Sequence, residues 1–169
     1  MNEIWAGLQA ALRLIVTLDA DPLMFDSGSI ANSIAFAKGR DADAKKMSRL
    51  YAIESQFTTT GASADHRLSV PSAGIAGFAA SLVAAVAQAK PDGKVDRSLP
   101  YRERVFAAMV QDLVDNKGAG VVMAGETQSP EVHALVHHLN QVLENNGTTI
   151  QFTDLPDPGR TSLQAIQDF

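Results

Sequence analysis

Polar residues stand where three apolar runs of the chain end, and their types could bind a ligand. Asp19 and Asp21 follow the first run, Glu54 ends the second, and Gly125 and Glu126 follow a third. The carboxyl ends of parallel strands meet at one edge of a sheet, which is where such sheets bind ligands. An acid that ends the second strand is also where nucleotide-binding folds hold a ribose. The first candidate site is therefore a cleft at this edge.

A structural role fits the same residues, together with Ser55 and Thr127, because strands are stopped and helices capped by such side chains. The sequence favours this second interpretation, since the fingerprints of phosphate-binding loops are missing. No G-x-G-x-x-G follows the first apolar run, and no G-x-x-x-x-G-K-[ST] occurs in the chain.

The histidines and hydroxyls give little support to metal or hydrolase chemistry. His133 and His137 are four residues apart on a predicted helix, but Glu131 precedes them, whereas the H-E-x-x-H motif needs an acid between them. We expect them, with His138, to flank the apolar stripe of that helix and to bind no metal. His66 follows Asp65 in a predicted loop, and no serine stands in a G-x-S-x-G elbow.

Composition excludes several kinds of site within these residues. The chain has 169 residues and no cysteine, so it offers no disulfide, iron–sulfur ligand, thiolate zinc site or cysteine nucleophile. The formal net charge of −5 disfavours broad binding to nucleic acid or anionic lipid. No apolar run approaches the roughly 18 residues of a membrane span, and the first residues do not resemble a signal peptide.

Apolar runs and helical patterns alternate along the chain. This alternation predicts a parallel sheet with helices on both faces. We expect four strands to share that sheet: Leu14–Leu18, Leu50–Ile53, Gly120–Ala124 and Thr149–Phe152; a short fifth is expected at Leu68–Val70. Helices are expected near residues 3–11, 30–38, 71–89, 100–116, 129–145 and 161–169. The polar stretch Gln56–His66 shows no helical period and is expected to be a surface loop at the carboxyl edge.

The most distinctive segments resemble one protein family. They read YAIES at residues 51–55, TGA at 60–62 and ADHRL at 64–68. LDADPL at 18–23, VVMAG at 121–125 and SPEVHAL at 129–135 follow the same order as in that family. Together they resemble the molybdopterin-oxidoreductase-like region of the iron–sulfur B subunit of alternative complex III, a bacterial quinol-oxidising complex. The resemblance covers nearly the whole chain, and SLQAI at 162–166 resembles a segment that the family continues further.

The resemblance implies one three-layer α/β/α sandwich over residues 1–169, with a mostly parallel, Rossmann-like sheet, as a fragment of a longer protein. It implies a non-catalytic structural domain of an electron-transfer subunit, with no cofactor in this chain, although family relatives use molybdopterin and 4Fe–4S clusters. Other domains or subunits of a membrane-associated complex are the expected partners, with no nucleic acid and no direct membrane insertion. The parent protein would act on the periplasmic side if it is exported.

An alternative stays open: a pterin- or nucleotide-binding domain of a molybdenum oxidoreductase of the formate dehydrogenase kind. Molybdenum enzymes hold the pterin dinucleotide with a loop that ends in PGTD, but here Pro71 is followed by Ser72-Ala73-Gly74, so the acid is absent. If a ligand does bind, the residues expected to contact it lie at the strand ends and in the TGA–ADHRL segment. They are Asp19, Glu54, Thr60, Asp65 and Gly125. For Asp65 we favour a salt bridge with Arg67 that fixes the turn into the next strand; the alternative is that this loop is the former pterin-binding edge, docked against a neighbouring domain of the parent.

Overall fold

The computed structural model of the protein describes residues 12–40 and 47–151, which fold around a four-stranded parallel sheet. The strands are β1 (Leu14–Leu18), β2 (Arg49–Glu54), β3 (His66–Ser69) and β4 (Gly120–Ala124). Every residue of β1 is buried, as expected for an uninterrupted Leu, Ile, Val and Thr run in the middle of a covered sheet. The strand order is β3-β2-β1-β4.

This strand order contains one reversal of direction. The chain moves from β1 outward to β2 and β3, then crosses back to place β4 on the other side of β1. Leu18 lies level with Ile53 on one side and with Ala124 on the other. The carboxyl ends of β1 and β4 therefore form the topological switch point, the place where open α/β sheets leave a crevice for a ligand.

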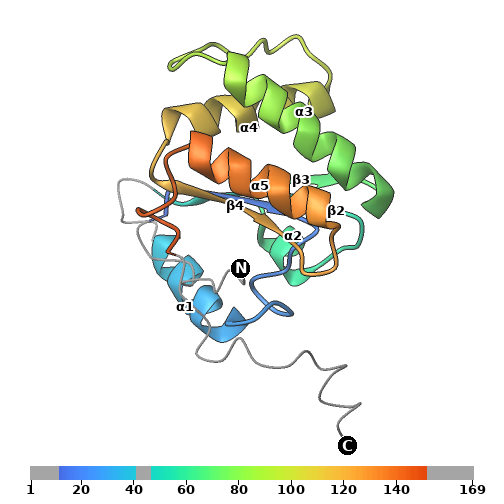
Figure 1. Ribbon diagram of the computed structural model, residues 1–169, viewed down its shortest axis with the longest axis vertical. Coiled ribbons are helices and arrows are strands. Elements are labelled where there is room, and N and C mark those ends of the chain that lie inside the picture. Colours follow the sequence, from blue (N-terminus) through green and yellow to red (C-terminus); the bar gives the residue numbers. More distant parts are fainter. Residues whose placement is uncertain (1–11, 41–46, 152–169) are drawn as a thin grey trace, which may run out of the picture.

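Helices cover both faces of the sheet, which confirms the predicted three-layer sandwich (Figure 1). On one face lie α3 (Ile75–Gln88), α4 (Tyr101–Asp115) and α5 (Pro130–Val142), whose apolar sides form the main core with β1 and β2. On the other face lies α1 (Ser29–Gly39), where Ala35 and Phe36 pack against a smaller cluster that includes Ile15, Leu50 and Val121.

Local signals set several helix ends. Ser129 caps α5, because its hydroxyl oxygen accepts a hydrogen bond from the Val132 N–H at 3.4 Å, and Pro130 occupies the first turn. A short 3₁₀ turn, η1 (Ser72–Gly74), precedes α3. The expected helices at 3–11 and 161–169 lie outside the described residues. Among the described residues, no helix is long and apolar enough to cross a membrane.

The prediction that Gln56–His66 is all loop is wrong in part. Thr59–Ser63 form a short helix, α2, which Thr58 caps by accepting a hydrogen bond from the Gly61 N–H at 3.0 Å. Thr60 and Gly61 are buried. Five residues are too few for a helical hydrophobic period, so the capping threonine was the only local signal.

The predicted strand at Thr149–Phe152 is also wrong over its described part, where only an isolated bridge joins Asn146 and Ile150. Side chains occupy the outer edge of β4 instead. Asn140 of α5 accepts from the Val122 N–H at 3.0 Å and donates to the Val122 carbonyl at 2.8 Å. The Thr149 hydroxyl donates to the Gly120 carbonyl at 2.6 Å. These bonds satisfy the edge groups that a fifth strand would need.

Candidate functional site

The switch point between β1 and β4 is filled by the chain itself. Gly125 follows β4, and its N–H donates to the Leu18 carbonyl at 2.9 Å. A Cβ atom on Gly125 would lie 1.9 Å from the carbonyl oxygen of Asp19, so only glycine allows the two backbones to come this close. Asp19 itself has a left-handed backbone with φ 55°. At the position where open α/β sheets leave a crevice, two strand ends are in direct contact.

The Asp19 carboxylate joins three segments across this edge. One oxygen, Oδ1, accepts from the Ser55 N–H at 2.7 Å and from the Ser55 hydroxyl at 2.9 Å. The other, Oδ2, accepts from the side-chain amide of Gln128 at 2.9 Å. The same amide donates to the Ser72 hydroxyl at 3.2 Å. One carboxylate therefore ties together the residues that follow β1, β2 and β4, and the Gln128 amide adds η1.

Glu54, at the end of β2, is fully buried and paired. Its carboxylate accepts from Arg67 Nε at 2.5 Å and from the Thr58 hydroxyl at 2.6 Å, with a side-chain exposure of 1%. A Cβ atom on Gly61 would lie 1.9 Å from Glu54 Oε1. Only a glycine at this position therefore lets the backbone of α2 pack this closely against the carboxylate. These contacts give the acid a structural partner on β3 and another on the loop before α2.

Thr60 and Asp21 form a second buried contact between the β1 and β2 loops. Asp21 Oδ1 accepts from the Thr60 N–H at 3.1 Å and from the Thr60 hydroxyl at 2.5 Å. The Thr60 oxygen in turn accepts from the Leu23 N–H at 3.2 Å. Within the described part of the chain, Asp21 Oδ2 is buried and has no hydrogen-bond partner. The contact with Thr60 therefore uses only one of the two Asp21 carboxylate oxygens.

Asp65 does not join the other four candidate residues. It precedes β3, and its N–H donates to the Leu50 carbonyl at 2.9 Å, which places it at the amino-terminal edge of the sheet. The structure therefore brings Asp19, Glu54, Thr60 and Gly125 to the carboxyl edge and leaves Asp65 at the opposite one.

The expected Asp65–Arg67 salt bridge is not formed. Asp65 pairs with Arg40 at 2.7 Å, while Arg67 pairs with Glu54. Neighbours at i and i+2 on a strand lie on the same face, but each of these side chains meets a stronger partner from another element. The turn into β3 is fixed by two separate pairs.

A further carboxyl group, Asp26, lies close to this edge in the loop before α1. Burial raises the pKa of Asp26, and the negative charges of Glu126 and Asp21 raise it further, while a backbone hydrogen bond with Asp21 opposes the change. Because the raised pKa belongs to the folded state, the charged form of Asp26 opposes folding.

Asp26→Asn is therefore expected to stabilise the chain at pH 7, by no more than about 0.5 kcal/mol because the group is only half-buried. The gain should vanish below the ordinary aspartate pKa of 3.8, where the group is protonated in both states, and appear as the pH rises through the raised value. Chemical denaturation of both proteins between pH 3 and 8 measures this difference. A gain that is equal at pH 3 and pH 7 would contradict the electrostatic explanation.

The histidines lie apart from the carboxyl edge. His133, His137 and His138 are on α5, and the last two are exposed. His66 starts β3 and stacks on the Tyr51 ring, with centroids 5.0 Å apart. Among the described residues, no three histidine or acidic side chains are grouped so as to hold a metal ion.

Sequence reasoning missed Gln128 and Ser72, which complete the Asp19 network. Gln128 immediately precedes the helix cap Ser129, and a cap position fixes where the preceding loop must lie. That signal places the residue near the edge but does not identify Asp19 as its partner, because the two are 109 residues apart.

The arrangement at the carboxyl edge holds loops together by hydrogen bonds from hydroxyl, amide and backbone N–H groups to carboxylates. A scan against protein-family models and a search of curated proteins both found no match for the chain.

Proposed function

We propose that this chain is a non-catalytic structural domain of an electron-transfer subunit of the molybdopterin-oxidoreductase-like kind. One observation carries the proposal: the switch point between β1 and β4, where a ligand would enter such a sheet, is closed by the contact of Gly125 with Asp19. Three side chains predicted to contact a ligand there, those of Asp19, Glu54 and Thr60, are hydrogen-bonded to other side chains.

The segment that corresponds to the family's pterin loop supports the same role. Ser72–Gly74 form the short turn η1, and the Ser72 hydroxyl accepts from Gln128, which also binds Asp19. The segment thus replaces a ligand contact by an internal one. In this proposal the redox centres belong to other parts of the parent protein, since the chain has no cysteine.

The Asp19→Ala variant distinguishes a structural role of the carboxyl edge from a ligand-binding role. If the edge is structural, the ligand-free chain should lose about 1–2 kcal/mol of unfolding free energy, because the Ser55 and Gln128 donors lose their acceptor. Residues kept for binding usually cost stability, so their removal would leave the ligand-free chain unchanged or more stable. Urea denaturation followed by circular dichroism gives the difference.

Asp92→Ala is the matched control for this variant. Asp92 has nearly the same left-handed backbone, with φ 56° against 55° for Asp19, but it is exposed and lies far from the carboxyl edge. Its substitution reports the backbone cost of alanine alone. The proposal requires Asp19→Ala to cost clearly more than Asp92→Ala, and equal losses would remove its support.

The proposed relation to the molybdopterin-oxidoreductase-like family can be tested with the gene sequence and with the purified chain. We expect the same gene to encode C-x-x-C-x-x-C-x-x-x-C-P runs, which ligate iron–sulfur clusters. We also expect mass spectrometry of the denatured protein to release no pterin. A gene without such cysteine runs would contradict the proposal, and stoichiometric pterin would favour the binding domain in its place.

A further inference from the structure

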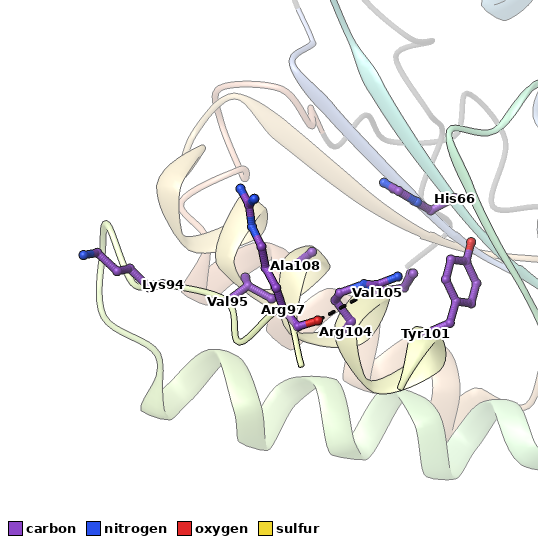
Figure 2. Close-up of a pocket in the computed structure, with 8 residues that line it drawn as sticks. All are labelled: His66, Lys94, Val95, Arg97, Tyr101, Arg104, Val105 and Ala108. Atoms are coloured by element: carbon purple, nitrogen blue, oxygen red, sulfur yellow. Dashed lines mark hydrogen bonds between the residues drawn. The ribbon is translucent and has the colours of Figure 1, made fainter. Parts of the chain in front are cut away.

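A cavity of about 590 Å³ lies on the β3 side of the sheet, away from the carboxyl edge. Its wall is made by the linker between α3 and α4, by the first turns of α4 and by His66, the first residue of β3 (Figure 2). Small-molecule sites commonly measure roughly 300–1,000 Å³. The cavity thus has the size of a ligand site, and it shares no residue with the network around Asp19.

All charged side chains that line this cavity are cationic. Lys94, Arg97 and Arg104 line it, and no acidic side chain does. None of the three takes part in an ion pair with any of the described residues. The acid of the same linker, Asp96, is held by the N–H of Ser98 at 2.9 Å and by its hydroxyl at 2.7 Å. In a chain of net charge −5, uncompensated cations gathered in one hollow favour an anionic ligand.

Of the two arginines, Arg104 is partly preoriented. Arg104 Nη1 donates to the Arg97 carbonyl at 3.4 Å, and the Arg104 guanidinium lies 6.0 Å from the centre of the Tyr101 ring. Figure 2 shows Arg104 between Arg97 and Tyr101, whereas Lys94 points outward from the loop. A guanidinium group matches the geometry of phosphate oxygens with two parallel donors, so arginine side chains suit a phosphate better than a lysine ammonium group does.

The remaining wall of the cavity is apolar and aromatic. Val95, Val105 and Ala108 contribute aliphatic surface, and the Tyr101 side chain is 54% exposed. His66 is held in place by its stack on Tyr51, whose hydroxyl donates to Asp112 at 2.6 Å. Exposed rings beside a cationic group are typical surfaces for stacking a flat ligand.

We propose that this cavity binds a small organic phosphate, with the phosphate on Arg97 and Arg104 and a flat ring against Tyr101 and His66. The cationic rim accounts for the phosphate, and the apolar wall accounts for a body that inorganic phosphate lacks. A ligand of this kind would bind outside the strand-end edge, so its binding does not depend on the structural role proposed for that edge.

Titration of the 169-residue chain with adenosine monophosphate tests the proposal, with adenosine and inorganic phosphate as separate probes. Isothermal calorimetry at low salt should give saturable 1:1 binding of the nucleotide, at least about tenfold tighter than binding of either probe alone. Arg97→Gln combined with Arg104→Gln should weaken nucleotide binding at least about tenfold, because both charge-assisted contacts are lost. Tyr101→Ala should weaken the nucleotide but not inorganic phosphate.

The control removes the same charge elsewhere. Lys38→Gln combined with Lys117→Gln lowers the net charge by the same two units at exposed sites on α1 and after α4. This double variant should bind the nucleotide as the unsubstituted chain does. If both double variants weaken nucleotide binding equally, the effect comes from the net charge of the chain, and the proposed site is wrong. Absence of nucleotide binding, or equal binding of adenosine, would overturn it as well.

Discussion

The Gly125→Ala variant is expected to lose about 3 kcal/mol of unfolding free energy. The added methyl carbon would lie 1.9 Å from the Asp19 carbonyl oxygen and 2.7 Å from its carbonyl carbon. Both are backbone atoms that cannot rotate away, so β1 and β4 must separate at their carboxyl ends. This separation lengthens the hydrogen bond from the Gly125 N–H to the Leu18 carbonyl. It also moves the Asp19 carboxylate away from Ser55 and Gln128. Chemical denaturation followed by circular dichroism measures the loss.

Gly77→Ala is the control, since a Cβ atom at this exposed position of α3 meets nothing within 4 Å. Alanine is the better helix former, so this variant should gain up to about 1 kcal/mol. The two glycines should therefore respond with opposite signs. A Gly125→Ala chain as stable as the unsubstituted one would mean that the strand ends separate easily. The closed switch point would then no longer support a structural role.

The sequence predicts well which strands form the carboxyl edge of the sheet, but it predicts poorly which residues contact one another there. The uninterrupted apolar runs at Leu14–Leu18 and Gly120–Ala124 are long enough to identify buried strands, and parallel pairing then brings Asp19 and Gly125 to one edge. Nothing local indicates that the two residues touch. The contact between Asp19 and Gly125 depends on the order of the strands. That order follows from how the helices pack, and neither apolar run predicts it.

Partners of charged residues were the least predictable feature. Asp65 and Arg67 are close in sequence, which made a bridge between them the simplest expectation. In the fold Asp65 meets Arg40 and Arg67 meets Glu54, in pairs separated by 25 and 13 residues. Which pair forms depends on how deeply each group is buried, because the buried Glu54 has the greater need for a cation. Burial is a property of the folded chain and not of any local pattern.

Arg67→Met is expected to cost about 3 kcal/mol, because it leaves the Glu54 carboxylate buried without its cation. Methionine keeps much of the length and apolar surface of the arginine stem, so the loss reports mainly the charge. Arg49→Met is the control: the Arg49 side chain is 51% exposed where it pairs with Asp112, and its removal should cost less than about 1 kcal/mol. Thermal and chemical denaturation at pH 7 compare the two variants.

A second substitution shows whether the cost comes from the unpaired charge. Glu54→Gln removes the charge and keeps an oxygen that can accept the Thr58 hydroxyl, so it should recover part of the stability lost in Arg67→Met. The double variant should therefore be more stable than Arg67→Met alone. If it is less stable by the sum of the two single losses, Glu54 and Arg67 act independently. Glu54 would then serve chiefly to hold Thr58 and the start of α2, rather than to bind β3 through Arg67.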